Sequence, residues 1–143
     1  MFQFLRTLIV GNRSTVAGAI AQFQRFENDL QQDFFALAAK SGKPRGLRWL
    51  SCEWLQELLI VVEQDSQLIS AFASVNLGFE AIEGGDMEEV EAVSTIRDGS
   101  AVFHFQNGSW GSAGRVVFNM NPTRAAEYII PAAAIVLHRE HGA

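Results

Sequence analysis

The sequence contains one cysteine, Cys52, and only three prolines in its 143 residues. A single cysteine cannot form a disulfide within the chain, so nothing requires an oxidising compartment, and we expect a cytoplasmic protein. Few prolines and the lack of a long biased tract argue against a disordered chain. Because this length suits one hydrophobic core, we predict a single domain over residues 1–143.

Basic residues are also few, since 11 Lys and Arg against 16 Asp and Glu give a net charge of −5. They are scattered, whereas proteins bind nucleic acids and anionic membranes through clustered Lys and Arg. We therefore expect no nucleic acid partner. The apolar run at residues 2–10 contains Arg6 and is too short to span a bilayer, so the sequence predicts no membrane span. This run is expected to pack on the body as a first helical turn or a strand.

A helical period extends from Ser14 to Ala39, where apolar residues recur at intervals of three and four. We predict one long helix that begins near residues 11–14 and ends at residues 41–44, where Gly and Pro stop it. Glu27 projects to the middle of the apolar stripe, where a charge is costly unless a partner meets it. The stripe consists of Val16, Ile20, Phe23, Leu30, Phe34 and Leu37, with Phe26 at its edge.

Alternation replaces the helical period after this helix. Residues 47–54 fit a strand or a short helix, and their pairing is not assigned by the pattern. Residues 58–64 and 67–82 flank Asp65–Ser66, which predicts a hairpin with Ile60 opposite Ala71 and Val62 opposite Ile69. One face of the hairpin is apolar and suits the long helix. Its reverse face also carries apolar side chains that a second helix or a second subunit must cover, namely Leu59, Val61 and Phe72.

Two further hairpin turns are predicted at Asp98–Gly99 and Asn107–Gly108, because both pairs supply the positive φ of a type I′ turn. They would join three strands within residues 90–118, with Ile96 opposite Ala101 and Phe105 opposite Trp110. In this register His104 lies on the other face from Phe105.

Asn121–Pro122 then begins a helical segment, which we expect to bend at Pro131 and continue to His138. The predicted fold is α+β: a long N-terminal helix across a twisted antiparallel meander of five to six strands, with a C-terminal helical segment.

Three groups of reactive side chains do not form a recognisable site. The carboxylates between Glu80 and Glu91 lack the spacing of a calcium loop. His138 and His141 lack a third ligand for zinc, so no metal site and no cofactor is predicted. Cys52 lies between tryptophans and apolar residues, which favours an inert thiol over a nucleophile. We therefore assign no catalytic residue.

Two hypotheses of function follow. The first is a non-catalytic binding or adaptor domain that forms a homodimer or binds a partner protein. The second is a small-molecule pocket between helix and sheet, which stores a ligand or acts on it as acid and base. An indole, His104, Arg48, Arg97 or Arg115 could meet the carboxylate of Glu27. The candidate pocket residues are Glu27, Phe23, Phe26, Trp49, Trp54, His104 and Trp110.

Overall fold

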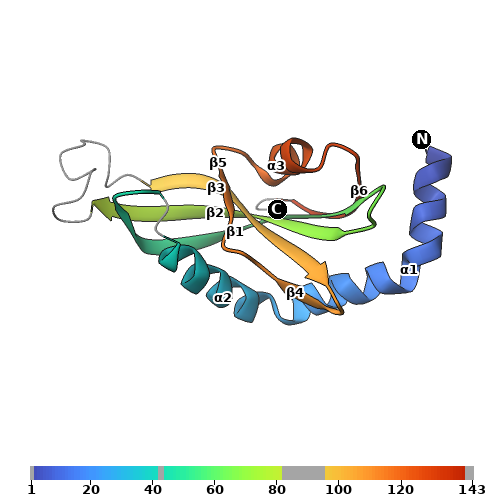
Figure 1. Ribbon diagram of the computed structural model, residues 1–143, viewed down its shortest axis with the longest axis horizontal. Coiled ribbons are helices and arrows are strands. Elements are labelled where there is room, and N and C mark those ends of the chain that lie inside the picture. The colour runs from blue at the N-terminus through green and yellow to red at the C-terminus, as the bar shows by residue number, and fades with distance from the viewer. Residues whose placement is uncertain (1, 42–43, 82–95, 141–143) are drawn as a thin grey trace.

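The computed structural model describes residues 2–41, 44–81 and 96–140, with side chains from Ser14 onward. Within these residues three helices and six strands form three layers (Figure 1). The sheet is antiparallel, with α1 and α2 on one face and α3 on the other, so the predicted α+β class is confirmed. The elements are α1 (Phe2–Arg25), α2 (Glu27–Lys40), β1 (Leu47–Glu63), β2 (Ile69–Ala81), β3 (Ile96–Gln106), β4 (Ser109–Gly111), β5 (Val116–Phe118), α3 (Pro122–Ile129) and β6 (Ala133–Arg139).

The strand order is β4-β3-β2-β1-β6, and β5 pairs with the first half of β3 while β4 pairs with its end. The chain therefore leaves one side of the sheet after β5, crosses the outer face through α3, and returns at the opposite side as β6. This crossing places α3 over β1 and β2.

The prediction of one long N-terminal helix is wrong, because the helix bends at Phe26 (φ −108°, ψ 18°) and divides into α1 and α2. Helical hydrogen bonds from Phe26 N to Gln22 O and from Leu30 N to Phe26 O continue through the bend. Phe23 and Phe34 are buried on either side of the bend, while the Glu27 side chain is 19% exposed. The predicted start near residues 11–14 is also wrong, because α1 begins at Phe2. Gly11 and Asn12 lie inside the helix, where such residues each cost only about 1 kcal/mol or less.

The hairpin of β1 and β2 confirms the predicted register, with Ile60 opposite Ala71 and Val62 opposite Ile69. Its inner face, which includes Ala71, Val75 and Phe79, is buried against α1 and α2. The reverse face is covered within the chain. Ala125 and Ala126 of α3 pack there in a second apolar cluster, which includes Leu59, Val61, Phe72, Val102, Val117 and Ile130. These apolar residues therefore give no reason to expect a second subunit.

The sequence left open whether residues 47–54 form a strand or a helix, and the structure shows a strand. They belong to β1, which continues without a break into the hairpin. The pairing with β2 shifts between Trp49 and Ser51 and again between Trp54 and Leu58. Such bulges bend a strand and redirect its side chains.

The predicted hairpin at Asp98–Gly99 is wrong, because both residues lie inside β3, opposite Asn76 and Val75 of β2. Gly99 serves a different purpose. An added Cβ would lie 2.8 Å from Val116 Cγ1 and 2.9 Å from the carbonyl oxygen of Val117, so glycine is what allows β5 to approach. Ile96 lies opposite Gly78 of β2 and not opposite Ala101 as predicted. The part of this strand prediction that concerns residues 90–95 lies outside the described residues.

The turn at Asn107–Gly108 is confirmed, with φ values of 55° and 82°. Phe105 lies opposite Trp110 as predicted. The helix after Asn121 is also confirmed, since the Asn121 side chain accepts a hydrogen bond from Arg124 N and caps α3. The prediction of a helix beyond Pro131 is wrong, because residues 133–139 form β6. Proline ends α3 there, and the edge of β1 supplies the backbone partners that stabilise a strand.

Candidate functional site

Glu27 forms a two-pronged ion pair with Arg139. Arg139 Nη1 donates to Glu27 Oε1 at 3.1 Å and Nη2 to Oε2 at 2.7 Å, while Nε donates to the carbonyl oxygen of Gln56 at 2.7 Å. The hydrogen bond to Glu27 is the main reason why the pKa of Arg139 is raised. The partner of Glu27 is thus a basic group, but not one of those considered from the sequence. This side chain joins the start of α2, the end of β6 and the middle of β1.

The other candidate aromatic residues fill the space between helices and sheet. The Phe23 ring lies 5.1 Å from Trp110 and the Phe34 ring 5.4 Å from Trp54, both edge to face. Trp49 packs 5.1 Å from Phe79. These are favourable aromatic contacts within a dense core. The structure therefore brings Phe23, Trp49, Trp54 and Trp110 into one packed cluster.

Phe26 and His104 lie apart from that cluster. Phe26 is 44% exposed at the helix bend, with the Arg25 guanidinium 5.3 Å from its ring centre. His104 lies on the outer face of the sheet, where its Nδ1 is 2.9 Å from the hydroxyl of buried Ser70. Burial, followed by the charge of Arg115, lowers the pKa of His104. Glu27 and His104 are consequently not brought together.

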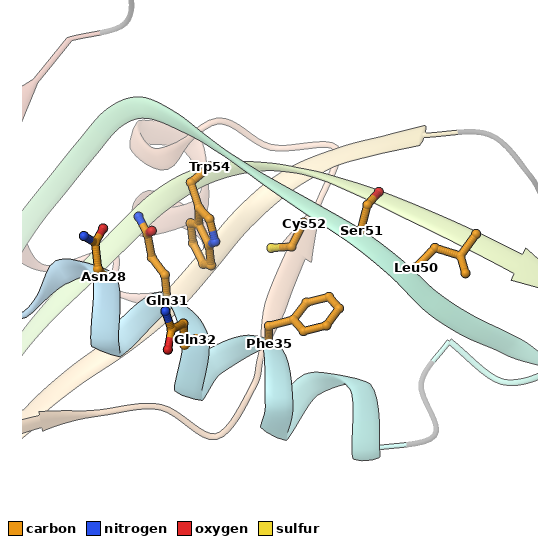
Figure 2. A pocket seen from close by; sticks show the side chains of 8 residues that line it. All are labelled: Asn28, Gln31, Gln32, Phe35, Leu50, Ser51, Cys52 and Trp54. Carbon is orange, nitrogen blue, oxygen red and sulfur yellow. The ribbon is translucent and has the colours of Figure 1, made fainter.

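A cleft of about 510 Å³ lies between α2 and β1, and we call it the α2–β1 cleft. Figure 2 shows α2 on one side and β1 on the other, with Cys52 pointing toward the helix and Ser51 away from it. Amide groups line the helix side, so the cleft offers neutral donors and acceptors. The lining residues are Asn28, Gln31, Gln32, Phe35, Leu50, Ser51, Cys52 and Trp54.

Only Trp54 of these lining residues was among the sequence candidates. A signal for the others was present: Asn28, Gln31 and Phe35 recur at intervals of three and four, which marks a second stripe on the same helix. The stronger apolar stripe obscured it. On β1, Leu50 is 54% exposed at the bulge between Trp49 and Ser51. The pattern of residue types along β1 does not predict this bulge.

The cleft lies beside an edge of β1 that no described strand covers. From Leu58 onward β1 is hydrogen-bonded to both β2 and β6, whereas Ser51–Trp54 pair with β2 and with no other described strand. The β6 pairing ends at Arg139, whose guanidinium donates to the carbonyl oxygen of Gln56. We call the side of residues 50–55 that faces away from β2 the open edge.

The cleft contains no activated nucleophile among the residues that line it. Burial raises the pKa of the Cys52 thiol to about 12, so the reactive thiolate is scarce at neutral pH. Nor do three His, Cys, Asp or Glu side chains gather as a metal site anywhere in the described ranges. The chemistry that the cleft can perform is recognition by hydrogen bonds and apolar contact.

The remaining charged candidates are engaged elsewhere or undescribed. Glu80 pairs with Arg48 at 2.9 Å on the surface, and the rest of the acidic cluster lies outside the described residues. His138 Nε2 lies 3.1 Å from Glu57 Oε2 at the end of β6, and His141 lies outside the described part. Neither group contributes to the α2–β1 cleft.

Comparison with protein-family models, with curated proteins and with solved structures found no match to this chain. Among the described residues, no helix combines the length and the apolar character needed to cross a membrane.

Proposed function

We propose that this protein is a non-catalytic binding domain that holds an extended segment of a partner polypeptide in the α2–β1 cleft. The observation that carries the proposal is the open edge, a strand edge that no strand of the described residues covers, directly beside a groove of amide side chains. A strand edge presents a row of backbone donors and acceptors, which an extended peptide satisfies by adding a strand.

The lining of the cleft suits a neutral backbone. Asn28, Gln31 and Gln32 each carry both a donor and an acceptor, so they can bond the amide groups of a peptide that face away from β1. Phe35, Leu50 and Trp54 provide apolar contact for alternate side chains. Because no lining residue is charged, the expected partner segment is uncharged and alternates polar with apolar residues.

The length of the cleft limits the segment. Leu50 to Trp54 spans roughly 13 Å at about 3.3 Å per residue, which admits four or five residues of an added strand. The Glu27–Arg139 pair lies next to Gln56, beyond Trp54 along β1, so we expect the segment to enter from the Leu50 end or from the side. A short strand with two or three side-chain contacts favours binding of moderate strength rather than a permanent complex.

Selection from a random peptide library displayed on phage tests the proposal, because it does not require the partner to be identified first. The informative variant is Leu50→Lys, which adds a charge at the open edge where the side chain is already 54% exposed. Leu37→Lys is the matched control, because Leu37 is 47% exposed on α2 but does not line this cleft.

We expect selected peptides to bind the wild-type protein and the Leu37→Lys variant alike, and to bind Leu50→Lys about tenfold more weakly or worse. Circular dichroism confirms that both variants are folded. Failure to select any peptide, or equal binding to Leu50→Lys, contradicts the proposal.

A small-molecule ligand is the second candidate, because about 510 Å³ lies within the usual range of about 300–1,000 Å³ for such sites. The cleft rather than a Glu27–His104 pocket is the site to examine. Native mass spectrometry of freshly purified protein tests this candidate: a co-purified compound lost in Leu50→Lys supports it, and a mass equal to that of the chain alone speaks against it.

A further inference from the structure

We propose that a second depression, at the hairpin of β3 and β4, binds a small molecule that carries one carboxylate group. The depression measures about 440 Å³ and shares no lining residue with the α2–β1 cleft. We call it the β3–β4 hollow. The half-buried ring of His104, the amide side chains of Gln106 and Asn107, and Gly111 are among its lining residues. This inference does not rest on the proposed function, because the two sites are separate.

Gly111 leaves the space of this hollow open. It lies opposite His104 in the pairing of β3 with β4, where the Cβ atoms of opposed residues are usually about 4.5–5.5 Å apart. A Cβ added at Gly111 would meet no atom within 4 Å, so close packing does not require glycine there. Its φ is not among the positive values of the described glycines, so the backbone does not require glycine either. The effect of this glycine is that the His104 ring stays uncovered on the side of β4.

The hydrogen bond of His104 determines which ring nitrogen is available to a ligand. Nδ1 lies 2.9 Å from the hydroxyl of Ser70, which is fully buried and has no other hydrogen-bond partner among the described residues. A buried hydroxyl hydrogen without an acceptor is costly, so Ser70 donates and Nδ1 accepts. Burial and the charge of Arg115 lower the pKa of His104 and keep its ring neutral. The neutral ring therefore carries its proton on Nε2, as a donor for a ligand.

The polar groups at the hollow favour an anionic acceptor. His104 Nε2 and the amide groups of Gln106 and Asn107 supply N–H donors, and no lining residue is acidic. The positive charge of Arg115 acts on His104, so it also acts on an anion bound at that ring. One cation and several donors match one carboxylate. A doubly charged phosphate fits less well, because its second charge has no counterpart among the lining residues.

Hydrogen bonds hold the walls of the hollow in place. The hydroxyl of Ser112 donates to the carbonyl oxygen of Val102 at 2.9 Å and accepts from Gly114 N at 2.9 Å, which fixes the chain after β4. Trp110 Nε1 donates to the carbonyl oxygen of Ala19 at 2.8 Å, which ties β4 to α1. Trp110 also lines the hollow and offers apolar contact to the body of a ligand. A site ordered before binding loses less conformational entropy when the ligand binds.

An NMR titration of the isotope-labelled chain with benzoate tests the proposal, and benzamide is the uncharged ligand of the same shape. We expect benzoate to shift the amide signals of residues 104–113 until saturation, with a dissociation constant on the order of 1 mM, which is usual for so small a ligand. Benzamide should bind about fivefold more weakly or worse, because it carries no charge. Arg115→Gln should weaken the binding of benzoate toward that of benzamide and leave benzamide unaffected.

Filling the hollow provides the matched pair of variants. Gly111→Leu places a side chain in the open space and should weaken benzoate binding about tenfold or more. Gly18→Leu is the control, because Gly18 is exposed on α1 and an added Cβ there also meets nothing within 4 Å. The amide spectrum of each variant shows whether it is folded. Arg115 is exposed, so Arg115→Gln tests the charge independently of how well Gly111→Leu folds.

The outcomes separate this site from the α2–β1 cleft. Absence of a saturating shift in residues 104–113 at about 20 mM benzoate, or unchanged binding to Gly111→Leu, overturns the proposal. Equal binding of benzoate and benzamide overturns the assignment of a carboxylate ligand. Leu50→Lys should bind benzoate as the wild-type chain does, and Gly111→Leu should bind a selected peptide as before. Loss of binding at one site therefore leaves the conclusion about the other unchanged.

Discussion

Arg139 binds both carboxylate oxygens of Glu27, a residue 112 positions earlier in the chain. The same guanidinium donates to the carbonyl oxygen of Gln56. One side chain thus fixes the start of α2 relative to the end of β6 and the second bulge of β1. Because α2 and β1 form the two walls of the α2–β1 cleft, the ion pair helps to hold these walls in position without lining the cleft.

Removing the carboxylate of Glu27 should destabilise the fold. Glu27→Ala leaves a partly buried guanidinium with one of its hydrogen-bond partners missing. We expect the free energy of unfolding to fall by about 1–2 kcal/mol, a value reduced by solvent screening of the partly exposed pair. Urea denaturation measures the loss. Glu80→Ala removes an exposed ion pair and should change stability by about 0.5 kcal/mol or less, so equal losses in the two variants would contradict this role.

Adding a methyl group at Gly99 should disturb the contact between β3 and β5. Gly99→Ala places a Cβ within 3 Å of Val116 and Val117, and we expect a loss of about 1–3 kcal/mol in the free energy of unfolding. Gly111→Ala is the control, because an added Cβ there meets nothing within 4 Å. Thermal unfolding of both variants provides the comparison. If the two changes are equally tolerated, the close approach of β5 is disproved.

The neutral ring of His104 should make stability depend on pH. Burial first, and then the charge of Arg115, hold its pKa below the ordinary value of 6.5. The unfolded chain therefore takes up a proton more readily. The contribution of the neutral His104 ring to the free energy of unfolding is complete above pH 6.5. It is lost as the pH falls from there toward the lower pKa of His104 in the folded state. Urea denaturation at about pH 8 and about pH 5 should show a smaller drop for His104→Gln than for the wild-type chain. An identical drop in both proteins would rule this out.

Cys52 should react slowly while the chain is folded. A pKa of about 12, against 9.0 for an ordinary thiol, leaves about a thousandfold less thiolate at neutral pH. Alkylation with iodoacetamide at pH 7 should therefore be much slower in buffer than in concentrated urea, where the thiol is exposed. Comparable rates in both solutions would show that the thiol is neither buried nor perturbed.

The sequence predicted those parts of the fold that depend on neighbours along the chain. The register of Ile60 with Ala71 follows from one short turn, and that of Phe105 with Trp110 follows from Asn107–Gly108. The Asp98–Gly99 prediction failed because the same two residue types also fit a strand that another strand approaches closely. Only the position of β5, which is a tertiary contact, distinguishes the two cases.

The candidate site was harder to predict because its parts come from distant segments. The sequence left open whether Glu27 lines a cavity or meets a partner, and Arg139 is brought to it by β6, which was predicted as a helix. Of the aromatic residues predicted to line a pocket, Phe23 is buried in the core, while Trp54 both packs on Phe34 and lines the α2–β1 cleft. Residue type alone does not distinguish a packed cluster from a cavity. The open edge depends on where β6 stops, and local pattern carries no information about that end point.

Amide hydrogen exchange of the open edge, measured with and without a selected peptide, tests the central claim most directly. Strand addition predicts that amides within residues 50–55 of β1 become protected when the peptide binds, while amides of α3 exchange at unchanged rates. Protection confined to other parts of the chain, with unchanged exchange in residues 50–55, would contradict binding at the open edge.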